Sequence, residues 1–161
     1  MAQATTPRQH VRVPGYIRLP GPIIRGLLRA GVPVGPNRLV TVHGRISGEP
    51  RTQALALLEF DGRRYVVGTF GDVNWCRNMR ANPEVQIQLG GRLEKVRAVE
   101  LTRDQAARFF REVLVPGIGR MPLFARLASR ALLSGYASDI ISDPALAATR
   151  RPVFELVPRP G

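Results

Sequence analysis

The chain has 161 residues, of which 44% are hydrophobic and 22% charged. This length and composition are sufficient for one domain with a buried core, and two domains are not expected. It carries 24 basic and 12 acidic residues, a net charge of +12, and every basic residue except Lys95 is arginine. This charge predicts an anionic partner: nucleic acid, an acidic membrane surface or a polyanionic small molecule. The single cysteine, Cys76, excludes an intramolecular disulfide.

Nothing in the sequence has the pattern of a membrane span or a secretory signal. The longest apolar stretches are interrupted by arginine, glycine or proline well short of the ~20 residues that cross a bilayer. The first residues lack an apolar run followed by a cleavage site. We therefore expect a cytoplasmic protein.

The N-terminal part predicts a flexible segment followed by a short helix. Residues 1–15 are polar and contain proline, which is typical of a loosely held terminus. Residues 16–37 are expected to form an amphipathic helix, over residues 22–31, and a connection, which leaves residues 38–161 as the main domain. The apolar face of this helix comprises Ile23, Ile24, Leu27 and Leu28, and its basic face Arg25 and Arg29.

The middle of the chain reads as strands joined by tight turns. Asp61-Gly62-Arg63 is a strong hairpin signal, and Gly90-Gly91 turns the chain back. The predicted strands cover residues 39–43, 53–60, 64–70, 85–89, 92–101 and 153–157. Antiparallel strands with hairpin links favour a small barrel, because closure removes exposed sheet edges. The expected fold class is α+β, mainly β.

Helices are expected on either side of the later strands. One covers residues 73–81 and ends at Asn82-Pro83; another begins at Thr102, which forms a capping box with Gln105, and runs to about Val115. Beyond this, an apolar helical face comprises Leu123, Phe124, Leu127, Ala128, Ala131 and Leu132.

A loop over residues 44–52 joins glycines, arginines and hydroxyls between two predicted strands. Glycine lets backbone N–H groups approach an oxyanion, and arginine holds phosphate or carboxylate with two parallel hydrogen bonds. An ordinary hairpin turn collects the same residue types, so composition leaves a structural turn and an anion site both open.

The order of the motifs resembles the deazaflavin (F420)-dependent nitroreductase and quinone reductase family. The motifs are Gly44-Arg45-x-Ser47-Gly48-x-Pro50-Arg51, Asp61-Gly62, Gly68-Thr69-Phe70-Gly71, Trp75-x-x-Asn78-x-x-Ala81-Asn82-Pro83 and Gly90-Gly91. They span roughly residues 38–115, with a weaker return at Arg151-Pro152-Val153-Phe154. The resemblance implies a split β-barrel of the FMN-binding type, coenzyme F420 as cofactor, and hydride transfer to a quinone, nitro compound or activated alkene. It also implies a homodimer.

The resemblance assigns the cofactor site residue by residue. The phosphate and glutamate tail of F420 would be lined by Gly44, Arg45, Ser47, Gly48, Pro50, Arg51 and Thr52. The deazaflavin would lie along Gly68, Thr69 and Phe70, with Trp75 and Asn78 completing the pocket. Tyr136 is the candidate catalytic residue, as a donor to the acceptor. Trp75 and Tyr136 also fit purely structural roles, and Cys76 is more typical of a small buried hydrophobe than of a nucleophile.

The sequence departs from the family pattern at three positions. Ile46 and Phe70 stand where members usually have basic residues, and Ala54 where they have proline. This motivates an alternative function: a split barrel that binds a fatty acid, FMN or haem without F420 turnover. Nucleic-acid binding rests on the charge alone.

Other chemistries lack their motifs. There is no Gly-x-Ser-x-Gly, the 44–48 segment lacks the Gly-Lys-Ser/Thr ending of a P-loop, and Cys76 with His10 and His43 makes no usual zinc site. The last expectation concerns lipid: residues 23–29 and 123–130 each pair an apolar face with arginines, as helices lying on an anionic membrane do, and as helices packed on a barrel also do.

Overall fold

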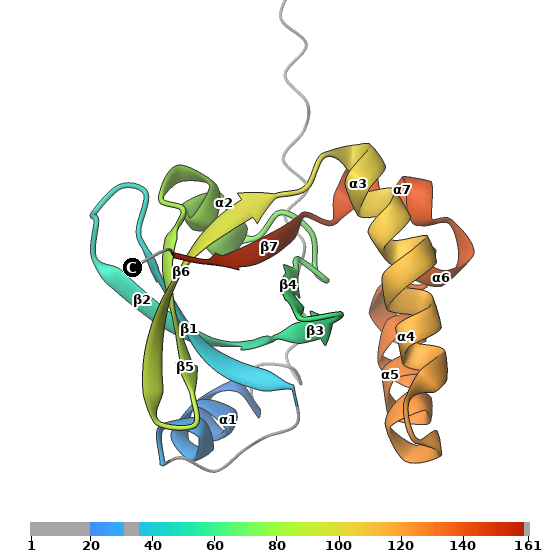
Figure 1. The fold of residues 1–161 in the computed structure, drawn as a ribbon, viewed down its shortest axis with the longest axis horizontal. Coiled ribbons are helices and arrows are strands. Elements are labelled where there is room, and N and C mark those ends of the chain that lie inside the picture. The colour runs from blue at the N-terminus through green and yellow to red at the C-terminus, as the bar shows by residue number, and fades with distance from the viewer. Residues whose placement is uncertain (1–19, 31–35, 160–161) are drawn as a thin grey trace, which may run out of the picture.

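The computed structural model describes residues 20–30 and 36–159, and it contains one antiparallel sheet of seven strands (Figure 1). The strand order is β2-β1-β5-β6-β7-β4-β3. The segment predicted to be flexible, residues 1–15, lies outside the described residues, as do residues 16–19 and 31–35 of the predicted helix and connection. The predicted α+β class, an antiparallel split barrel with peripheral helices, is confirmed, although helices take up more of the described residues than the expected mainly β composition.

The strands follow the predicted pattern with small shifts of their ends. They are β1 (Asn37–His43), β2 (Pro50–Ala56), β3 (Leu58–Phe60), β4 (Arg63–Val67), β5 (Glu84–Leu89), β6 (Arg92–Glu100) and β7 (Val153–Pro158). The two edge strands, β2 and β3, are separated in the chain only by Leu57. The sheet therefore curls so that its two ends approach each other, which gives the half-barrel of a split-barrel fold.

One predicted strand, residues 53–60, is divided in two. Its first part pairs with β1 and its second with β4, and between them the amide of Leu57 donates to the carbonyl of Pro36. The predicted strand 64–70 stops at Val67, because the next amide, that of Gly68, donates to the carbonyl of Pro152 in a loop. The Asp61-Gly62 turn is confirmed, with φ positive at both residues, as a tight hairpin requires.

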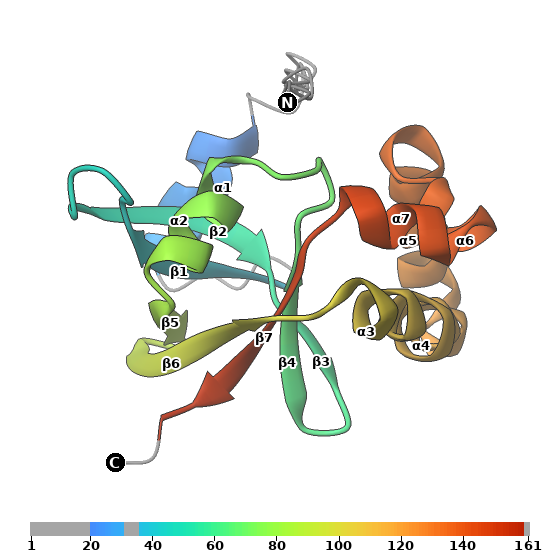
Figure 2. The ribbon, with the colours of Figure 1, turned by 90° about the horizontal axis from the view of Figure 1, so that it is seen from above.

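Two apolar clusters lie on opposite faces of the curled sheet. The inner cluster fills the half-barrel with side chains that alternate along the strands, such as Val85 and Ile87 on β5. The outer cluster joins Tyr65 of β4 to Phe109 and Phe110 of the helical layer. Figure 2 shows this layer standing to one side of the sheet, whereas α1 and α2 lie with the barrel strands.

The helices comprise α1 (Pro20–Arg29), α2 (Asn74–Ala81), α3 (Arg103–Arg108), the π-helical η2 (Phe109–Leu114), α4 (Val115–Arg120), α5 (Leu123–Tyr136), α6 (Asp139–Ser142) and α7 (Pro144–Arg150). The capping box of Thr102 and Gln105 is present. The helix that follows was expected to end near Val115 but continues to Arg120, and its wider π-helical turn comes just before Pro116, which has no N–H to donate.

Part of α5 does not bury its apolar face. Leu123, Phe124 and Leu127 are 61%, 85% and 58% exposed, whereas Leu133 in the last turn is buried. Among the described helices, none is both long and apolar enough to cross a bilayer.

Candidate functional site

The loop between β1 and β2 closes on itself around Gly44. The amide of Gly44 donates to the carbonyl of Glu49, and the amide of Gly48 donates to the carbonyl of Gly44, both at 2.9 Å. A Cβ on Gly44 would lie 2.9 Å from Ser47 Oγ and 3.2 Å from Arg51 Nε, and Gly48 has a φ of 71°. The positive φ of Gly48 requires glycine for this backbone shape, whereas a side chain at Gly44 would displace the Ser47 and Arg51 side chains. The side chains of Ser47 and Arg51 thus lie close to Gly44.

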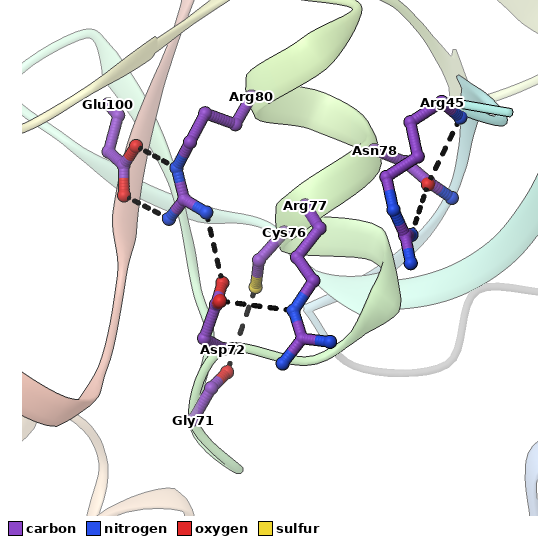
Figure 3. A network of polar contacts seen from close by, with 8 residues as sticks. All are labelled: Arg45, Gly71, Asp72, Cys76, Arg77, Asn78, Arg80 and Glu100. Carbon is purple, nitrogen blue, oxygen red and sulfur yellow. Dashed lines mark hydrogen bonds and ion pairs between the residues drawn. The ribbon is translucent and has the colours of Figure 1, made fainter. Parts of the chain in front are cut away.

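Helix α2 fixes the loop from the side. Asn78, which is 5% exposed, accepts hydrogen bonds on Oδ1 from the Arg45 amide at 3.3 Å and from Arg45 Nη1 at 2.9 Å (Figure 3). Four residues later, Asn82 Nδ2 donates to the carbonyls of His43 and Gly44. The structure thus brings together Arg45 and Asn78, which were assigned to the same site from different motifs.

Two cations on this loop have no carboxylate partner among the described residues. Arg45 and Arg51 are exposed, and no salt bridge involves either of them. Pro50 is exposed beside Arg51, and Thr52 is tied to β1 through a 2.7 Å contact between its hydroxyl and that of Thr41. An uncompensated pair of arginines over a glycine turn fits an anionic group.

The second predicted segment, Gly68 to Phe70, forms a tight loop after β4. Gly71 donates its amide to the Gly68 carbonyl at 2.8 Å, and Gly68 has no room for a side chain, because a Cβ would lie 2.8 Å from the Gly71 oxygen. The Phe70 ring meets the Tyr136 ring at 5.8 Å between centroids, edge to face. The candidate catalytic residue is therefore adjacent to the loop that was assigned to the deazaflavin.

Trp75 and Cys76, at the start of α2, both pack inward. The Trp75 ring is half-buried and lies 6.0 Å from the Phe154 ring at the inner cluster, so its structural role is shown and its contact with a cofactor stays a prediction. Cys76 is fully buried and its Sγ donates to the Gly71 carbonyl at 3.7 Å. Burial raises the pKa of the Cys76 thiol to about 12, so it remains protonated at neutral pH and is no nucleophile.

An exposed ion-pair network holds α2 against β6. Arg80 makes two 2.6 Å hydrogen bonds to Glu100, and Arg80 and Arg77 both reach Asp72 (Figure 3). The bond to Glu100 raises the pKa of the Arg80 guanidinium further above its ordinary value. Through Asp72 the network also fixes the end of the 68–71 loop.

Sequence reasoning missed two residues that hold the site. Asn82 was interpreted as a helix stop and as part of a family motif without a role at the loop, and Arg151 only as part of a weak motif return. Arg151 has a largely covered side chain that pairs with Asp139 at 2.8 Å, and it also donates to backbone carbonyls. A charged residue two positions before a buried strand was the one available signal.

One cavity lies apart from these loops. It has a volume of about 270 Å³ and opens between β4, β7 and α3, and none of the predicted site residues lines it. Its wall includes Tyr65, Phe109 and the ion pair of Arg63 with Glu155. Within the described part of the chain, no cluster of His, Cys, Asp or Glu could hold a metal ion.

Comparison with known proteins identifies the family of the chain. Residues 21–117, more than half of the chain, match the F420H(2)-dependent quinone reductase family, and the chain belongs to that family. It is accordingly an oxidoreductase whose cofactor is coenzyme F420.

Solved structures share more distant similarity. An F420-H2 dependent reductase is 22% identical, with 75% of this chain and 93% of that chain covered and a TM-score of 0.42. A domain-swapped dimer is 23% identical over 88% and 96% of the chains, with a TM-score of 0.44. HutZ, a haem storage protein from Vibrio cholerae, is 15% identical over 87% and 90%, with a TM-score of 0.46.

Proposed function

We propose that the chain binds reduced F420 with the loop of residues 44–52 and reduces a quinone, nitro compound or activated alkene beside Phe70 and Tyr136. The observation that carries the placement is the uncompensated pair Arg45 and Arg51 over the Gly44 turn. F420 carries a phosphate and a glutamate tail, and several cationic and backbone donors suit such a group. When bound and reduced, F420 supplies the hydride.

The residues of the chain would bind, orient and exclude water. Arg45 is held by Asn78, so at least one cation is presented in a defined direction and loses less side-chain freedom on binding, and Arg51 lies beside it on the same loop. The Phe70 and Tyr136 rings supply an aromatic surface for an apolar acceptor. The Tyr136 hydroxyl would donate a hydrogen bond to the acceptor oxygen, where negative charge develops.

The departures from the family pattern sharpen the test. Ile46 stands where family members usually have a basic residue, and it is 91% exposed on the loop. The loop therefore presents an apolar side chain where a cation is usual. Arg45 and Arg51 would then provide most of the binding energy for the anionic tail of F420. The experiment is a fluorescence titration of the wild-type protein and Arg51→Ala with F420, with FMN and a long-chain fatty acid as alternative ligands. Exposed Arg92 on β6 provides the control, Arg92→Ala.

Arg51→Ala should weaken F420 binding by about 1.5–3 kcal/mol, the range for a hydrogen bond to a charged group, and by less at high salt. Equal affinity of Arg51→Ala and Arg92→Ala would show that the loop does not bind the tail. Tight binding of FMN or the fatty acid with none of F420 would favour the alternative function.

We also propose a homodimer. Leu93 and Val99 on β6 and Val157 on β7 are 70%, 44% and 38% exposed, and Val99 and Val157 are diagonal neighbours on one face of the sheet. Apolar side chains on an outer sheet face favour cover by a second copy, and a two-fold pair would have two equivalent sites. Light scattering of the wild-type protein and Val99→Lys tests this: a wild-type mass near that of the 17.7 kDa monomer would contradict it.

A further inference from the structure

Arg151 lies between α7 and β7 with a side chain that is only 11% exposed, and its guanidinium meets acceptors from three separate segments. Nη2 lies 2.8 Å from Asp139 Oδ1 and 3.0 Å from the Tyr136 carbonyl, and Nε lies 3.1 Å from the same carboxylate. Nη1 donates to the Thr69 carbonyl. A charge this deeply buried requires such compensation, so the arrangement is costly to disturb.

The contact with Tyr136 supplies what the end of α5 lacks. The last turn of α5 contains no basic residue, and the helix stops at Tyr136 without a glycine cap. Terminal carbonyls carry the negative end of the helix dipole, and a cation there satisfies one of them. Arg151 provides that cation from another part of the chain, and it also pairs with Asp139 in the first turn of α6.

The contact with Thr69 connects Arg151 to the 68–71 loop, which carries the other ring of the Phe70–Tyr136 pair. Thr69 is followed by Phe70, whose ring meets Tyr136. The neighbour of Arg151, Pro152, accepts the Gly68 amide at 2.8 Å, so two consecutive residues hold the loop by its backbone. Arg151 thus bonds the main chain of Tyr136 and of the residue before Phe70.

We infer that Arg151 is a positioning residue for the reductase reaction: it holds Phe70 and Tyr136 in register through their backbones, and so shapes the surface that receives the electron acceptor. This rests on the proposed function, because only then do these two rings face an acceptor. Arg151 itself contacts neither the acceptor nor the anionic tail of F420. Its loss therefore lowers affinity for the acceptor and leaves F420 binding nearly unchanged.

The test compares Arg151→Gln with Arg63→Gln, which loses a two-bond ion pair with Glu155 away from both rings. Three quantities are measured for each purified protein: the F420 dissociation constant by fluorescence, the steady-state KM and kcat for menadione, and amide hydrogen exchange in the free protein at residues 68–71 and 136–139. Arg151→Lys, which retains the charge and fewer donors, is the rescue variant.

Arg151→Gln should raise KM for menadione on the order of tenfold or more, with a smaller change in kcat and an F420 affinity close to wild type. Exchange should accelerate in both segments, and Arg151→Lys should lie between wild type and Arg151→Gln. Arg63→Gln should change none of these. If Arg151→Gln does not fold, Arg151→Lys and Asp139→Asn must show the same two effects in smaller measure.

An unchanged KM in these folded variants, or hydrogen exchange that accelerates in only one segment, overturns the inference. If the wild-type protein still binds F420, the proposed function is not affected by that result. A loss of kcat and F420 affinity with unchanged KM also overturns it, since general loosening of the structure would explain that. Wild-type protein that binds no F420 refutes the proposed function and this inference with it.

Discussion

Asn78 and Arg45 are 33 positions apart in the sequence, yet the side-chain oxygen of Asn78 accepts hydrogen bonds from both the backbone amide and the guanidinium of Arg45. One buried amide thereby fixes the backbone at the start of the 44–52 loop and the direction of the Arg45 side chain. The pairing leaves the charge of Arg45 uncompensated, because an amide oxygen is neutral. An arginine held in this way remains available to an anion.

This relationship predicts the effect of adding a charge at position 78. Asn78→Asp would place a carboxylate within hydrogen-bond distance of Arg45 and compensate its charge, so F420 affinity should fall about tenfold, ~1.4 kcal/mol. The matched control is Asn74→Asp, the same change at an exposed position in the first turn of α2. Fluorescence titration measures both. Equal losses in the two variants would mean that overall charge, and not Arg45, determines affinity.

The packing of the 68–71 loop predicts an intolerance of side chains at Gly68. A Cβ there would lie 2.8 Å from the Gly71 carbonyl oxygen and 3.0 Å from Pro152 Cδ. Because backbone cannot move aside cheaply, Gly68→Ala should cost about 1–3 kcal/mol of unfolding free energy and weaken F420 binding. Urea unfolding of the protein without cofactor gives the first quantity.

The comparison variant is Gly119→Ala in α4, where nothing lies within 4 Å of the new Cβ. Alanine should there stabilise the helix by up to about 1 kcal/mol. A Gly68→Ala protein as stable as Gly119→Ala would show that the loop is looser than its contacts indicate.

Much of the fold follows from local signals in the sequence. The Gly90-Gly91 turn, the period of two along β5 and the capping box at Thr102 each depend on residues within a few positions of one another, and all three are observed. The 44–52 loop is local as well, since backbone hydrogen bonds of Gly44 with Gly48 and Glu49 and the positive φ of Gly48 define its shape. Structural features that depend only on residues close together in the chain can be predicted from a single sequence.

The remainder depends on contacts between distant segments. The division of β2 from β3 at Leu57 is set by partners on β1 and β4, and no residue near Leu57 signals it. The role of Arg151 requires Thr69, Tyr136 and Asp139 to converge, which only the tertiary structure shows. Such a convergence leaves no periodic or motif-like trace.

The buried thiol predicts a stability that depends on pH in the alkaline range. The pKa of Cys76 is about 12 in the folded protein against 9.0 for an ordinary thiol, so between these values the unfolded chain releases a proton that the folded one retains. The stabilisation is complete below pH 9 and is lost as pH rises toward 12, by up to roughly 1.4 kcal/mol per pH unit.

Urea unfolding between pH 8 and pH 11 measures this slope, and Cys76→Ala isolates it from the other groups that titrate there. The difference in unfolding free energy between wild type and Cys76→Ala should shrink as pH rises. A difference independent of pH, or rapid reaction of the native thiol with a disulfide reagent at pH 8, would contradict the burial of Cys76.

The last prediction concerns lipid, and it depends on apolar side chains that two helices leave in water. Ile23 and Leu27 of α1 are 64% and 41% exposed, and Phe124 of α5 is 85% exposed, with arginines on both helices. Although α1 packs against β1 and β2 and buries Leu28, its Ile23 and Leu27 remain exposed to water. In an anionic lipid interface they would be covered, and each nearby arginine would add about 1 kcal/mol of attraction.

We therefore expect the full-length protein to sediment with phosphatidylcholine vesicles that contain phosphatidylglycerol, more strongly as the anionic fraction rises and less as salt is added. The double variant Leu27→Gln with Phe124→Gln should bind several-fold more weakly, whereas Leu146→Gln, an exposed apolar position on α7, should not. Equal weakening in both variants would assign the interaction to charge alone. Full-length protein that stays in the supernatant with anionic vesicles at low salt would end the membrane hypothesis, and the electron acceptor would then have to reach the Phe70 and Tyr136 surface from water.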